Sequence, residues 1–210
     1  MIDLYTWSTP NGRKISIFLE EAGVEYEAHG INLIENDQFN PDFLEISPNN
    51  KIPAIRDRDT GISLMESGAI LIYLAEKYGQ FLPDSGEERL RVLEWLMFQM
   101  GGVGPMFGQV HYFVKYNAGK SEFAENRFTN EAHRLYGVLD KRLANNDFLG
   151  GAQYSIADIA TWPWVSRFEW QRIDLHGYPN VLDWYVRIAA RPGVRRGYHV
   201  PRWVNEIPMP

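Results

Sequence analysis

The chain has 210 residues, 21 basic and 27 acidic side chains, a net charge of −6, and no cysteine. This length suits one large domain or two small ones, and an aromatic content of 14% argues against disorder. The absence of cysteine excludes disulfide bonds, thiolate zinc sites, iron–sulfur clusters and a cysteine nucleophile. Any thiol chemistry must therefore use a thiol that a ligand brings.

The acidic balance gives no non-specific attraction to nucleic acid or to an anionic membrane surface. Residues 95–114 carry no formal charge and match the length of a membrane span. Gln99, Gln109 and His111, with a glycine-rich centre between them, favour a soluble helix with a break instead. No signal peptide is expected, because a strand-like sequence begins at Ile2, and we expect a cytoplasmic protein.

Charge and turn residues divide the chain near residues 82–86. Residues 1–83 hold 6 basic and 13 acidic side chains, a net charge of −7, whereas residues 84–210 hold 15 and 14, a net charge of +1. The sequence Leu-Pro-Asp-Ser-Gly at the junction is typical of a turn. We therefore expect two domains, at residues 1–83 and 87–210.

The first elements alternate between strand and helix. Residues 2–5 predict a short strand, and Thr9 followed by Pro10 predicts a helix start, with a hydroxyl N-cap and proline in the first turn. Apolar residues at helical spacing continue to Gly23, which is expected to end the helix. Residues 26–33 predict a second strand.

The rest of the first part completes a small α/β domain. Residues 41–46 predict a short helix, and residues 53–57 and 62–65 predict a hairpin joined by a polar turn. Ser67 is expected to cap a last helix that runs to about Tyr78. The order βαβαββα fits a sheet that contains both parallel and antiparallel pairs.

The second part has helical periodicity and few strand signals, which predicts an all-α helical bundle. Its strongest helical segments are residues 87–100, 122–144, 156–168 and 181–190. Ser155 and Asp158 fit a capping box, with aspartate in the reciprocal position, ahead of an apolar helix. We interpret this pair as a folding element and not as a site.

Several kinds of site have no local support. The five histidines are dispersed and form no two-histidine metal motif, so we expect no metal site. The sequence also lacks a phosphate-binding glycine loop and a nucleophile elbow. Nucleotide and serine-hydrolase chemistry are therefore not indicated.

The turn at residues 7–12 is a candidate anion site. Ser8, Thr9 and Asn11 place hydroxyl and amide groups at a helix N-terminus, where free backbone N–H groups and the helix dipole stabilise an anion, including a thiolate. A plain helix start has the same pattern, so this motif alone does not establish a site.

Two further motifs fit the recognition of a peptide-like ligand. Lys51, Ile52 and Pro53 open a strand after a polar loop; a cis bond before Pro53 turns the Ile52 backbone toward a bound peptide. Glu66 suits a ligand ammonium, and Ser67 at a helix N-terminus suits a carboxylate. A capped core helix with a surface glutamate explains the last pair equally well.

Taken together, these segments resemble the glutathione S-transferase family. SPNNKIPAI at 47–55 and ESGAILIYLAEKY at 66–78 resemble the glutathione-site half of its thioredoxin-like domain, and SIADIATWPW at 155–164 resembles its buried capping-box helix. Longer strings resemble the nu-class branch of bacterial disulfide-bond oxidoreductases: TPNGRKISIFLEEAGVEYE at 9–27, QFNPDFLEISPNNKIPAI at 38–55 and GGVGPMFGQ at 101–109. The resemblance covers essentially the whole chain.

The resemblance implies a glutathione site and a homodimer. The residues that it assigns to glutathione are Asn11, Gln38, Lys51, Ile52, Pro53, Glu66 and Ser67. Glu66 takes the γ-glutamyl ammonium and Ser67 the α-carboxylate, while Ile52 acts through its backbone. Arg127 matches an arginine that the partner subunit lends to the site.

The resemblance to the nu-class branch also implies that Thr9 and Asn11 contact the sulfur of glutathione, and their place at a helix N-terminus is compatible with this role. Related transferases lower the thiol pKa of glutathione with tyrosine, serine or cysteine near the end of the first strand, and cysteine is absent here. Tyr5 is expected to pack inward. We predict that Thr9 with Asn11 stabilises the thiolate, with Ser8 as the alternative.

Three functions are compatible with such a site. The favoured one is a glutathione-dependent thiol–disulfide oxidoreductase that uses bound glutathione or glutathione disulfide and no protein cysteine. The alternatives are a transferase that conjugates glutathione with electrophiles, and a non-catalytic glutathione-binding regulator. The physiological disulfide or electrophile is not specified by the sequence.

Overall fold

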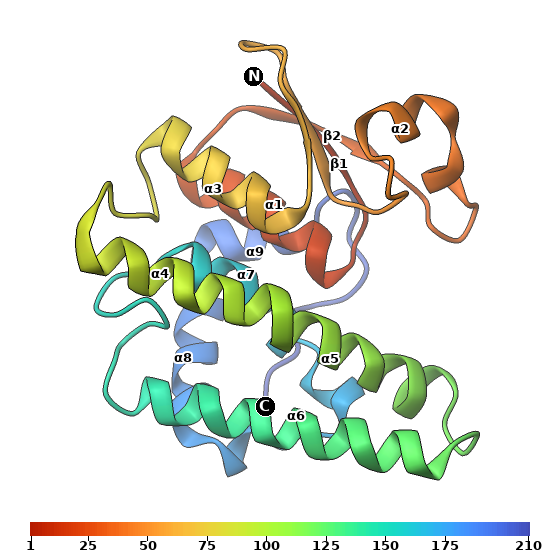
Figure 1. Cartoon of the computed structure of the whole chain (residues 1–210), viewed down its shortest axis with the longest axis vertical. Coiled ribbons are helices and arrows are strands. Elements are labelled where there is room, and N and C mark those ends of the chain that lie inside the picture. The colour runs from red at the N-terminus through yellow and green to blue at the C-terminus, as the bar shows by residue number, and fades with distance from the viewer. The chain divides into compact units, whose positions relative to one another are not determined.

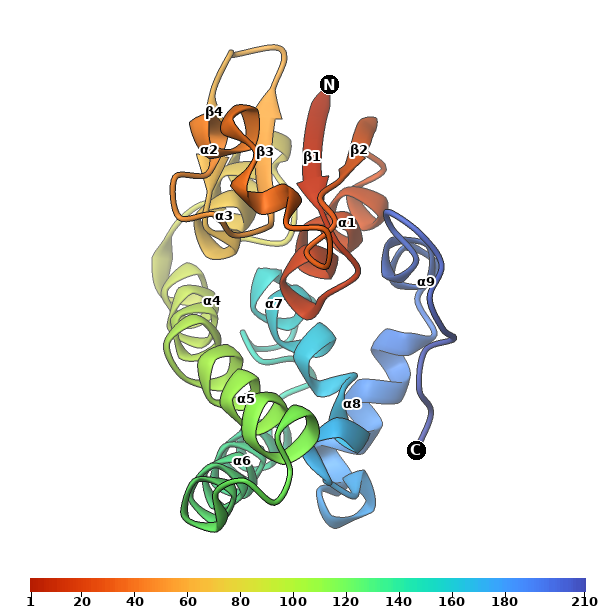
Figure 2. The ribbon, with the colours of Figure 1, turned by 90° about the vertical axis from the view of Figure 1, so that its right-hand side faces the viewer.

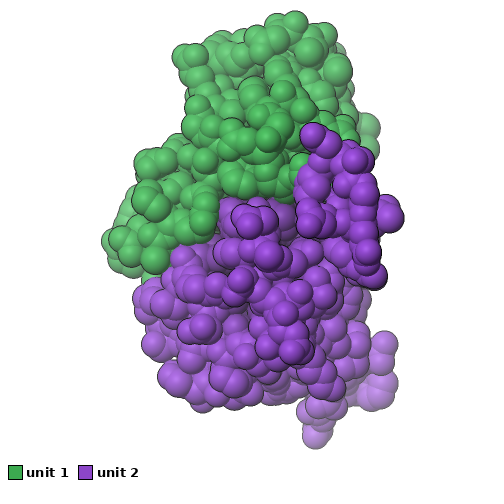
Figure 3. Space-filling model, turned by 90° about the vertical axis from the view of Figure 1, so that its left-hand side faces the viewer, with its two compact units in different colours: residues 1–82, 189–207 green, residues 83–188, 208–210 purple.

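The computed structural model describes all 210 residues, which form two compact units. One unit contains residues 1–82 and 189–207, and the other contains residues 83–188 and 208–210 (Figure 3). These units depart from the expected division at 1–83 and 87–210, because the segment 189–207 is part of the first unit. The reason is a C-terminal helix that packs on the first helix of the chain.

The first unit is built on a four-stranded mixed sheet in the order β2-β1-β3-β4. Its strands are β1 (Ile2–Thr6), β2 (Tyr26–Gly30), β3 (Ala54–Asp57) and β4 (Ser63–Met65). The β1–β2 pair is parallel, and the β1–β3 and β3–β4 pairs are antiparallel. This confirms the mixed sheet, although β2 ends three residues earlier than its apolar pattern predicts.

Helices cover both faces of this sheet. They are α1 (Pro10–Ala22), α2 (Pro41–Ile46), α3 (Ser67–Tyr78) and α9 (Pro192–Tyr198), with a short 3₁₀ turn, η1 (Asp37–Phe39), before α2. Helices α1 and α3 lie on one face and α2 on the other (Figures 1 and 2). The unit therefore has the expected thioredoxin-like order, with α9 added from the C-terminus.

Helix α1 is buried around its whole circumference in its central part. Its start and end are as predicted: the Thr9 hydroxyl accepts a hydrogen bond from the Gly12 N–H (3.4 Å), and Gly23 adopts a left-handed conformation with φ 66°. Every residue from Gly12 to Leu19 is buried. Strand β1, α3 and α9 all contact this helix.

The C-terminal segment binds α1 closely. Gly197 lies so near α1 that a Cβ atom there would come within 2.6 Å of the Ile17 backbone. The Ser16 hydroxyl donates to the Gly197 carbonyl (2.7 Å), and Arg13 Nε donates to the Tyr198 carbonyl (3.0 Å). At the other end of α1, Arg191 Nε donates to Glu21 (2.6 Å). Helix α9 is therefore an integral part of the first unit.

The chain beyond α9 reaches the turn that precedes α1. The guanidinium of Arg202 lies 4.3 Å from the ring centre of Trp7, and the Ser8 hydroxyl donates to the Arg202 carbonyl (3.3 Å). A second cis peptide bond, Val200–Pro201, occurs in this segment. The C-terminal segment thus holds both α1 and the turn that leads into it.

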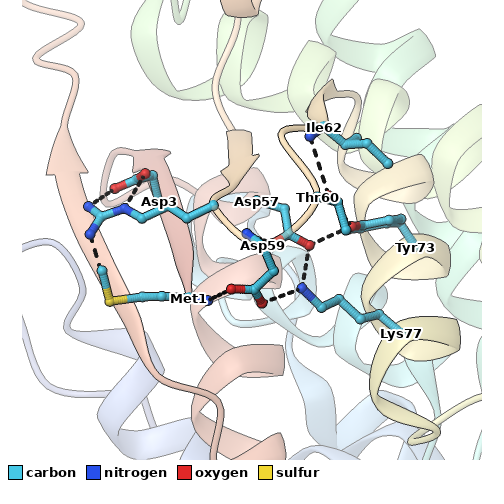
Figure 4. Close-up of polar contacts among 9 residues, drawn as sticks. Met1, Asp3, Asp57, Asp59, Thr60, Ile62, Tyr73 and Lys77 are labelled. Atoms are coloured by element: carbon cyan, nitrogen blue, oxygen red, sulfur yellow. Dashed lines mark hydrogen bonds and ion pairs between the residues drawn. The ribbon is translucent and has the colours of Figure 1, made fainter.

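A polar network fixes the β3–β4 hairpin to the end of α3 (Figure 4). Asp57 accepts hydrogen bonds from the Tyr73 hydroxyl and the Lys77 ammonium, and Lys77 also contacts Asp59 (2.8 Å). Burial by itself raises the pKa of Asp57, but the bonds from Lys77 and Tyr73 outweigh it and hold the pKa at about 2. The Met1 ammonium completes the network by donating to Asp59 (2.9 Å).

A second network joins β1, β2 and the hairpin turn. Arg58 donates to Asp3 and to Glu27 (2.5 Å), and the His29 ring contacts Asp3 (2.8 Å). The hydrogen bonds from Arg58 lower the pKa of Asp3 to about 2, although burial opposes them. The carboxylate and imidazole atoms of this cluster lie within 4.8 Å of one another. Because Arg58 binds both carboxylates, the arrangement is an ion-pair network.

The second unit is helical, as predicted, with more helix than the periodicity indicates. Its helices are α4 (Gly86–Phe98), α5 (Gly104–Val110), α6 (Glu122–Leu143), α7 (Ile156–Val165) and α8 (Pro179–Ala189). Wider π-type segments, η2 (Gln99–Val103) and η3 (His111–Tyr116), follow α4 and α5, and 3₁₀ turns lie at η4 (Phe168–Gln171) and η5 (Leu175–Gly177). The expected break at Gly104 is therefore a π-type turn inside a continuous helical run.

Asp158 is the polar centre of the second unit. The capping box is present: the Ser155 hydroxyl accepts from the Ala157 N–H, and Asp158 accepts from the Ser155 N–H (3.0 Å). Asp158 also accepts from the Leu149 N–H and from the indole N–H of Trp184 (2.9 Å each). The pair is a folding element, as predicted. No helix in the structure combines the length and the apolar character that a membrane span requires.

Candidate functional site

The sheet register brings the three sequence motifs together at one end of the strands of the first unit. Tyr5 of β1 pairs with Ala54 of β3, and Ala54 pairs with Met65 of β4. Because these neighbouring strands are antiparallel, the end of β1, the start of β3 and the end of β4 lie in one row. The adjoining segments 6–9, 52–53 and 66–67 therefore lie next to one another at this end of the strands.

At the end of β1, the tight turn into α1 holds Thr9. Thr9 is half-buried, and its hydroxyl oxygen and its carbonyl accept hydrogen bonds from the first turn of α1. Gly12 makes this geometry possible, because a Cβ there would come within 2.2 Å of the Trp7 carbonyl oxygen. Asn11 lies half-buried in the same turn. The hydroxyl of Thr9 and the amide of Asn11 thus stand at the positive end of the α1 dipole.

The start of β3 presents backbone and not side chain. The Ile52–Pro53 peptide bond is cis, as the family resemblance implies. The Ile52 side chain belongs to a buried cluster with Phe43, Ile46 and Ala54. Any contact between Ile52 and a ligand must therefore come from its backbone. The Lys51 side chain is exposed, and its carbonyl accepts from the Ser47 hydroxyl (2.8 Å).

After β4, the helix start differs from the expectation that Ser67 is the N-cap. Glu66 occupies the cap position with φ 70° and ψ 111°, makes no capping hydrogen bond, and is exposed; Ser67 is the first helical residue and is buried. The positive φ of Glu66 turns the chain one residue before the expected position, a conformation that costs free energy in a non-glycine residue. The Ser67 hydroxyl oxygen accepts a hydrogen bond from Lys14 Nζ (3.1 Å) instead of capping α3.

Lys14 lies next to the proposed site and was not predicted from the sequence. It lies in the buried part of α1 with 1% of its surface exposed. Burial lowers the pKa of Lys14 to about 7, while the carboxylate of Glu66 opposes this shift. A signal was available: Lys14 stands one helical turn before Phe18 and directly before Ile15, on a helix whose apolar residues predict burial.

The remaining predicted residues lie in different places. Gln38 is in η1, on the loop after β2, and its side-chain oxygen is buried without a hydrogen-bond partner. Arg127 lies on α6 in the second unit, where it is exposed and its guanidinium is 6.0 Å from the ring centre of Phe128. Its role across a subunit interface remains a prediction.

Tyr5 is not suited to activate a thiol. Its ring stacks on His29 with 4.8 Å between ring centres and packs against the cluster around Phe43. Burial raises the pKa of Tyr5. Because the Tyr5 ring is engaged in this packing, the hydroxyl and amide groups at the start of α1 remain the favoured thiolate donors.

Two family models match the chain. The model of the glutathione S-transferase N-terminal domain matches residues 1–76, and that of the glutathione S-transferase C-terminal domain matches residues 122–187. The first match contains the whole sheet and the strand ends described above. The second contains the capping box and helix α7.

Curated relatives and solved structures share nearly the full length of the chain. Disulfide-bond oxidoreductase YfcG of Escherichia coli is 54% identical over 197 residues, covering 91% of this chain and 92% of that protein. Disulfide-bond oxidoreductase YghU of Escherichia coli is 41% identical over 216 residues, covering 96% of this chain and 75% of that protein.

Similar solved structures contain bound glutathione or glutathione disulfide. A glutathione transferase from Burkholderia graminis, with two glutathione molecules bound per subunit, has a TM-score of 0.90 and 46% identity, covering 95% of this chain and 88% of that one. A glutathione transferase from Pseudomonas putida, with one glutathione disulfide bound per subunit, has a TM-score of 0.89 and 45% identity, covering 95% and 91% of the two chains.

Proposed function

This chain belongs to the glutathione S-transferase family, and from that premise we propose that it is a glutathione-dependent thiol–disulfide oxidoreductase. The observation that carries this proposal is the absence of cysteine in a chain that is 54% identical to a disulfide-bond oxidoreductase. Every sulfur atom in the reaction then belongs to glutathione or to the substrate. Glutathione is the co-substrate, in its reduced or disulfide form.

The edge of the sheet supplies the proposed glutathione site. Glu66 takes the γ-glutamyl ammonium, because an exposed carboxylate next to the helix start pairs with a cation. Ser67 and the N–H groups that begin α3 take the α-carboxylate. The Ile52 backbone pairs with the ligand as an added strand does. The other residues that we assign to the site are Asn11, Gln38, Lys51 and Pro53.

Thr9 and Asn11 stabilise the glutathione thiolate. Hydroxyl and amide groups at a helix N-terminus donate hydrogen bonds to sulfur and lower the pKa of a thiol without acting as a base. The thiolate attacks a disulfide sulfur of the substrate, forms a mixed disulfide and releases one substrate thiolate. A second glutathione thiolate attacks the mixed disulfide, releases the other substrate thiolate and leaves glutathione disulfide. Two glutathiones thereby supply the two electrons.

The assembly and the compartment are part of the same proposal. A homodimer is supported by Arg127, which is exposed on α6 and matches an arginine that the partner subunit lends to the site in the family. A cytoplasmic location is supported by the absence of cysteine, because a reducing compartment gives disulfide bonds no role.

The test is turnover of 2-hydroxyethyl disulfide with reduced glutathione, followed by coupling the glutathione disulfide formed to glutathione reductase. We expect a rate well above the uncatalysed exchange, and no excess over that rate contradicts the proposal. The same preparation is assayed with chlorodinitrobenzene. A dominant conjugation rate identifies a conjugating transferase, and glutathione binding with both assays silent identifies a non-catalytic binding protein.

A further inference from the structure

A fully buried lysine stands directly behind the proposed carboxylate site. Lys14 Nζ lies 3.1 Å from the Ser67 hydroxyl oxygen, at the first residue of α3, and 1% of the Lys14 surface is exposed. Lysine is almost never fully buried unless it is paired, because desolvating an ammonium is costly. The hydroxyl that Lys14 contacts belongs to Ser67, which we assign to the ligand carboxylate, so the position of this buried lysine bears on ligand binding.

The charged groups around Lys14 single out Glu66. Its carboxylate is the one charged side chain that acts to keep Lys14 protonated. Other charged groups on the elements that pack on α1 in this unit face other partners or solvent; on α3, Lys77 binds Asp57 of β3 and Glu76 is exposed. On α1 and α9, these are Arg13 over the Tyr198 ring, Glu20 with Arg196, and Glu21 with Arg191; on β1, Asp3 binds Arg58 and His29.

The protonation state of Lys14 fixes the direction in which Ser67 can donate. An ammonium group has donors and no acceptor, so the Ser67 oxygen accepts from it and the serine hydrogen must point elsewhere. A neutral amine has a lone pair and can accept that hydrogen. Only the charged form therefore secures the serine hydroxyl as a donor to a ligand carboxylate, and it adds a positive charge behind the start of α3.

We propose that Lys14, as a buried ammonium, positions Ser67 and the start of α3 for the α-carboxylate of the γ-glutamyl group, so that glutathione binding is coupled to proton uptake at Lys14. This inference rests on the proposed function and deepens it. Lys14 is a positioning residue, because it acts on the ligand through Ser67.

The coupling has a defined sign. Because the pKa of Lys14 in the unliganded protein is about 7, the ammonium form loses population as the pH rises through neutrality. A bound carboxylate favours the ammonium and raises the pKa of Lys14. By linkage, affinity is greatest below about pH 7 and falls as the pH rises above it.

The experiment is calorimetric titration with S-methylglutathione, which has no ionisable thiol, from about pH 6 to about pH 8, where a lysine of this kind titrates. Buffers of different ionisation enthalpy report the number of protons taken up. For the wild-type protein we expect the Kd to rise about fivefold across this range, with uptake of about half a proton at neutral pH.

Three variants separate this role from a structural one. Lys14→Met is expected to bind weakly at low pH, with a flat pH profile and no proton uptake. Lys14→Arg, which stays charged, is expected to keep its affinity with a flat profile. Lys141→Met, on the exposed surface of α6, is the matched control and keeps the wild-type profile.

The outcomes distinguish the two levels of the proposal. Binding by the wild-type protein without proton uptake overturns the role of Lys14 and leaves the proposed function standing. The same holds if Lys14→Met keeps the wild-type pH slope. Absence of binding at every pH overturns the proposed function itself. If both Lys14 variants fail to fold, proton uptake by the wild-type protein alone decides.

Discussion

At the scale of single residues, the proposed site combines groups that serve the fold with the roles that we assign to them toward the ligand. Thr9 caps α1 through its oxygen and also presents a hydroxyl at the helix N-terminus. Glu66 adopts a positive φ that places its carboxylate outside α3. Lys14 adds a charge that burial disfavours. Such local costs are typical of functional sites and are borne by the surrounding structure.

Thr9→Ala removes both roles of this residue. The lost cap should lower the free energy of unfolding by about 1 kcal/mol. The lost thiolate donor should lower kcat/KM for disulfide exchange by about tenfold to hundredfold. Thr9→Ser keeps both hydroxyl contacts and should stay within about threefold of wild type.

The pKa of the bound glutathione thiol, followed by its ultraviolet thiolate absorbance, separates these roles. We expect this pKa to rise in Thr9→Ala and in Asn11→Ala. Ser8→Ala tests the alternative donor, because the Ser8 hydroxyl donates to the Arg202 carbonyl in the structure. If only Ser8→Ala raises the thiol pKa, the assignment to Thr9 is wrong.

The site residues that can be predicted from the sequence are those that belong to a local sequence motif. Thr9 with Pro10 and Glu66 with Ser67 stand at helix starts, which hydroxyl and proline patterns mark. The structure nevertheless places Ser67 inside α3, because the positive φ of Glu66 leaves no pattern that propensity can detect. Lys14 was missed because its partner is 53 residues away in the sequence.

At the scale of elements, the β3–β4 hairpin depends on one buried carboxylate. Asp57 ties the hairpin to Tyr73 and Lys77 of α3, and it directly precedes the turn that returns β4 to the sheet edge (Figure 4). Because β4 ends at the proposed ligand site, this network positions Glu66 from the opposite end of the strand.

The acid stability of the protein should depend on Asp57. Its pKa is about 2 in the folded protein and near 3.9 in an unfolded chain, so its stabilisation is complete above about pH 4 and is lost as the pH falls toward 2. This shift corresponds to about 2 to 3 kcal/mol. Asp57→Asn should therefore destabilise by about 2 to 3 kcal/mol at neutral pH and show a shallower loss of stability in acid.

Urea unfolding at a series of pH values measures this effect. Asp84→Asn, which changes an exposed aspartate at the junction of the two units, is the matched control and should follow the wild-type curve. Asp3 contributes acid dependence of its own, so the Asp57→Asn curve is not expected to be flat. Parallel wild-type and Asp57→Asn curves would show that this network adds no stability.

The types of most elements follow from the periodicity of apolar residues. Two differences between the sequence-based prediction and the structure have separate causes. The strands, α1, α3, α6 and the capping box of α7 carry strong local signals. For residues 95–114 the sequence predicts a helix with a break, because Gly104 and Pro105 ordinarily mark one, whereas the structure has a continuous helical run there. Here a π-type turn and Pro105 in the first turn of α5 accommodate them. Short α9 lacks the length that periodicity needs.

At the scale of the whole molecule, the chain forms two compact units that differ in how many chain segments build them. The second unit is nearly uninterrupted, whereas the first joins residues 1–82 to residues 189–207. Composition and charge predict the boundary between the two parts of the sequence. They do not predict that the last segment joins the first unit, because this depends on contacts between α9 and α1 that have no local sequence pattern.

Gly197→Ala tests how much the packing of α9 on α1 contributes to stability. A Cβ at position 197 would come within 2.6 Å of the Ile17 backbone, so α9 must shift, and we expect a loss of about 2 to 3 kcal/mol. Gly177→Ala adds the same atom where no neighbour lies within 4 Å and should change stability by no more than about 0.5 kcal/mol. Thermal unfolding compares the two, and equal midpoints contradict the expected contribution.

The position of α9 also sets the order in which the protein can be completed. Domains generally fold as units while the chain is being synthesised from its N-terminus. Here residues 1–82 leave the ribosome before residues 83–188, and the helix that covers α1 follows only after both. The buried strip of α1 therefore stays uncovered until residues 83–188 have been made, and the first unit is completed only after the main segment of the second unit.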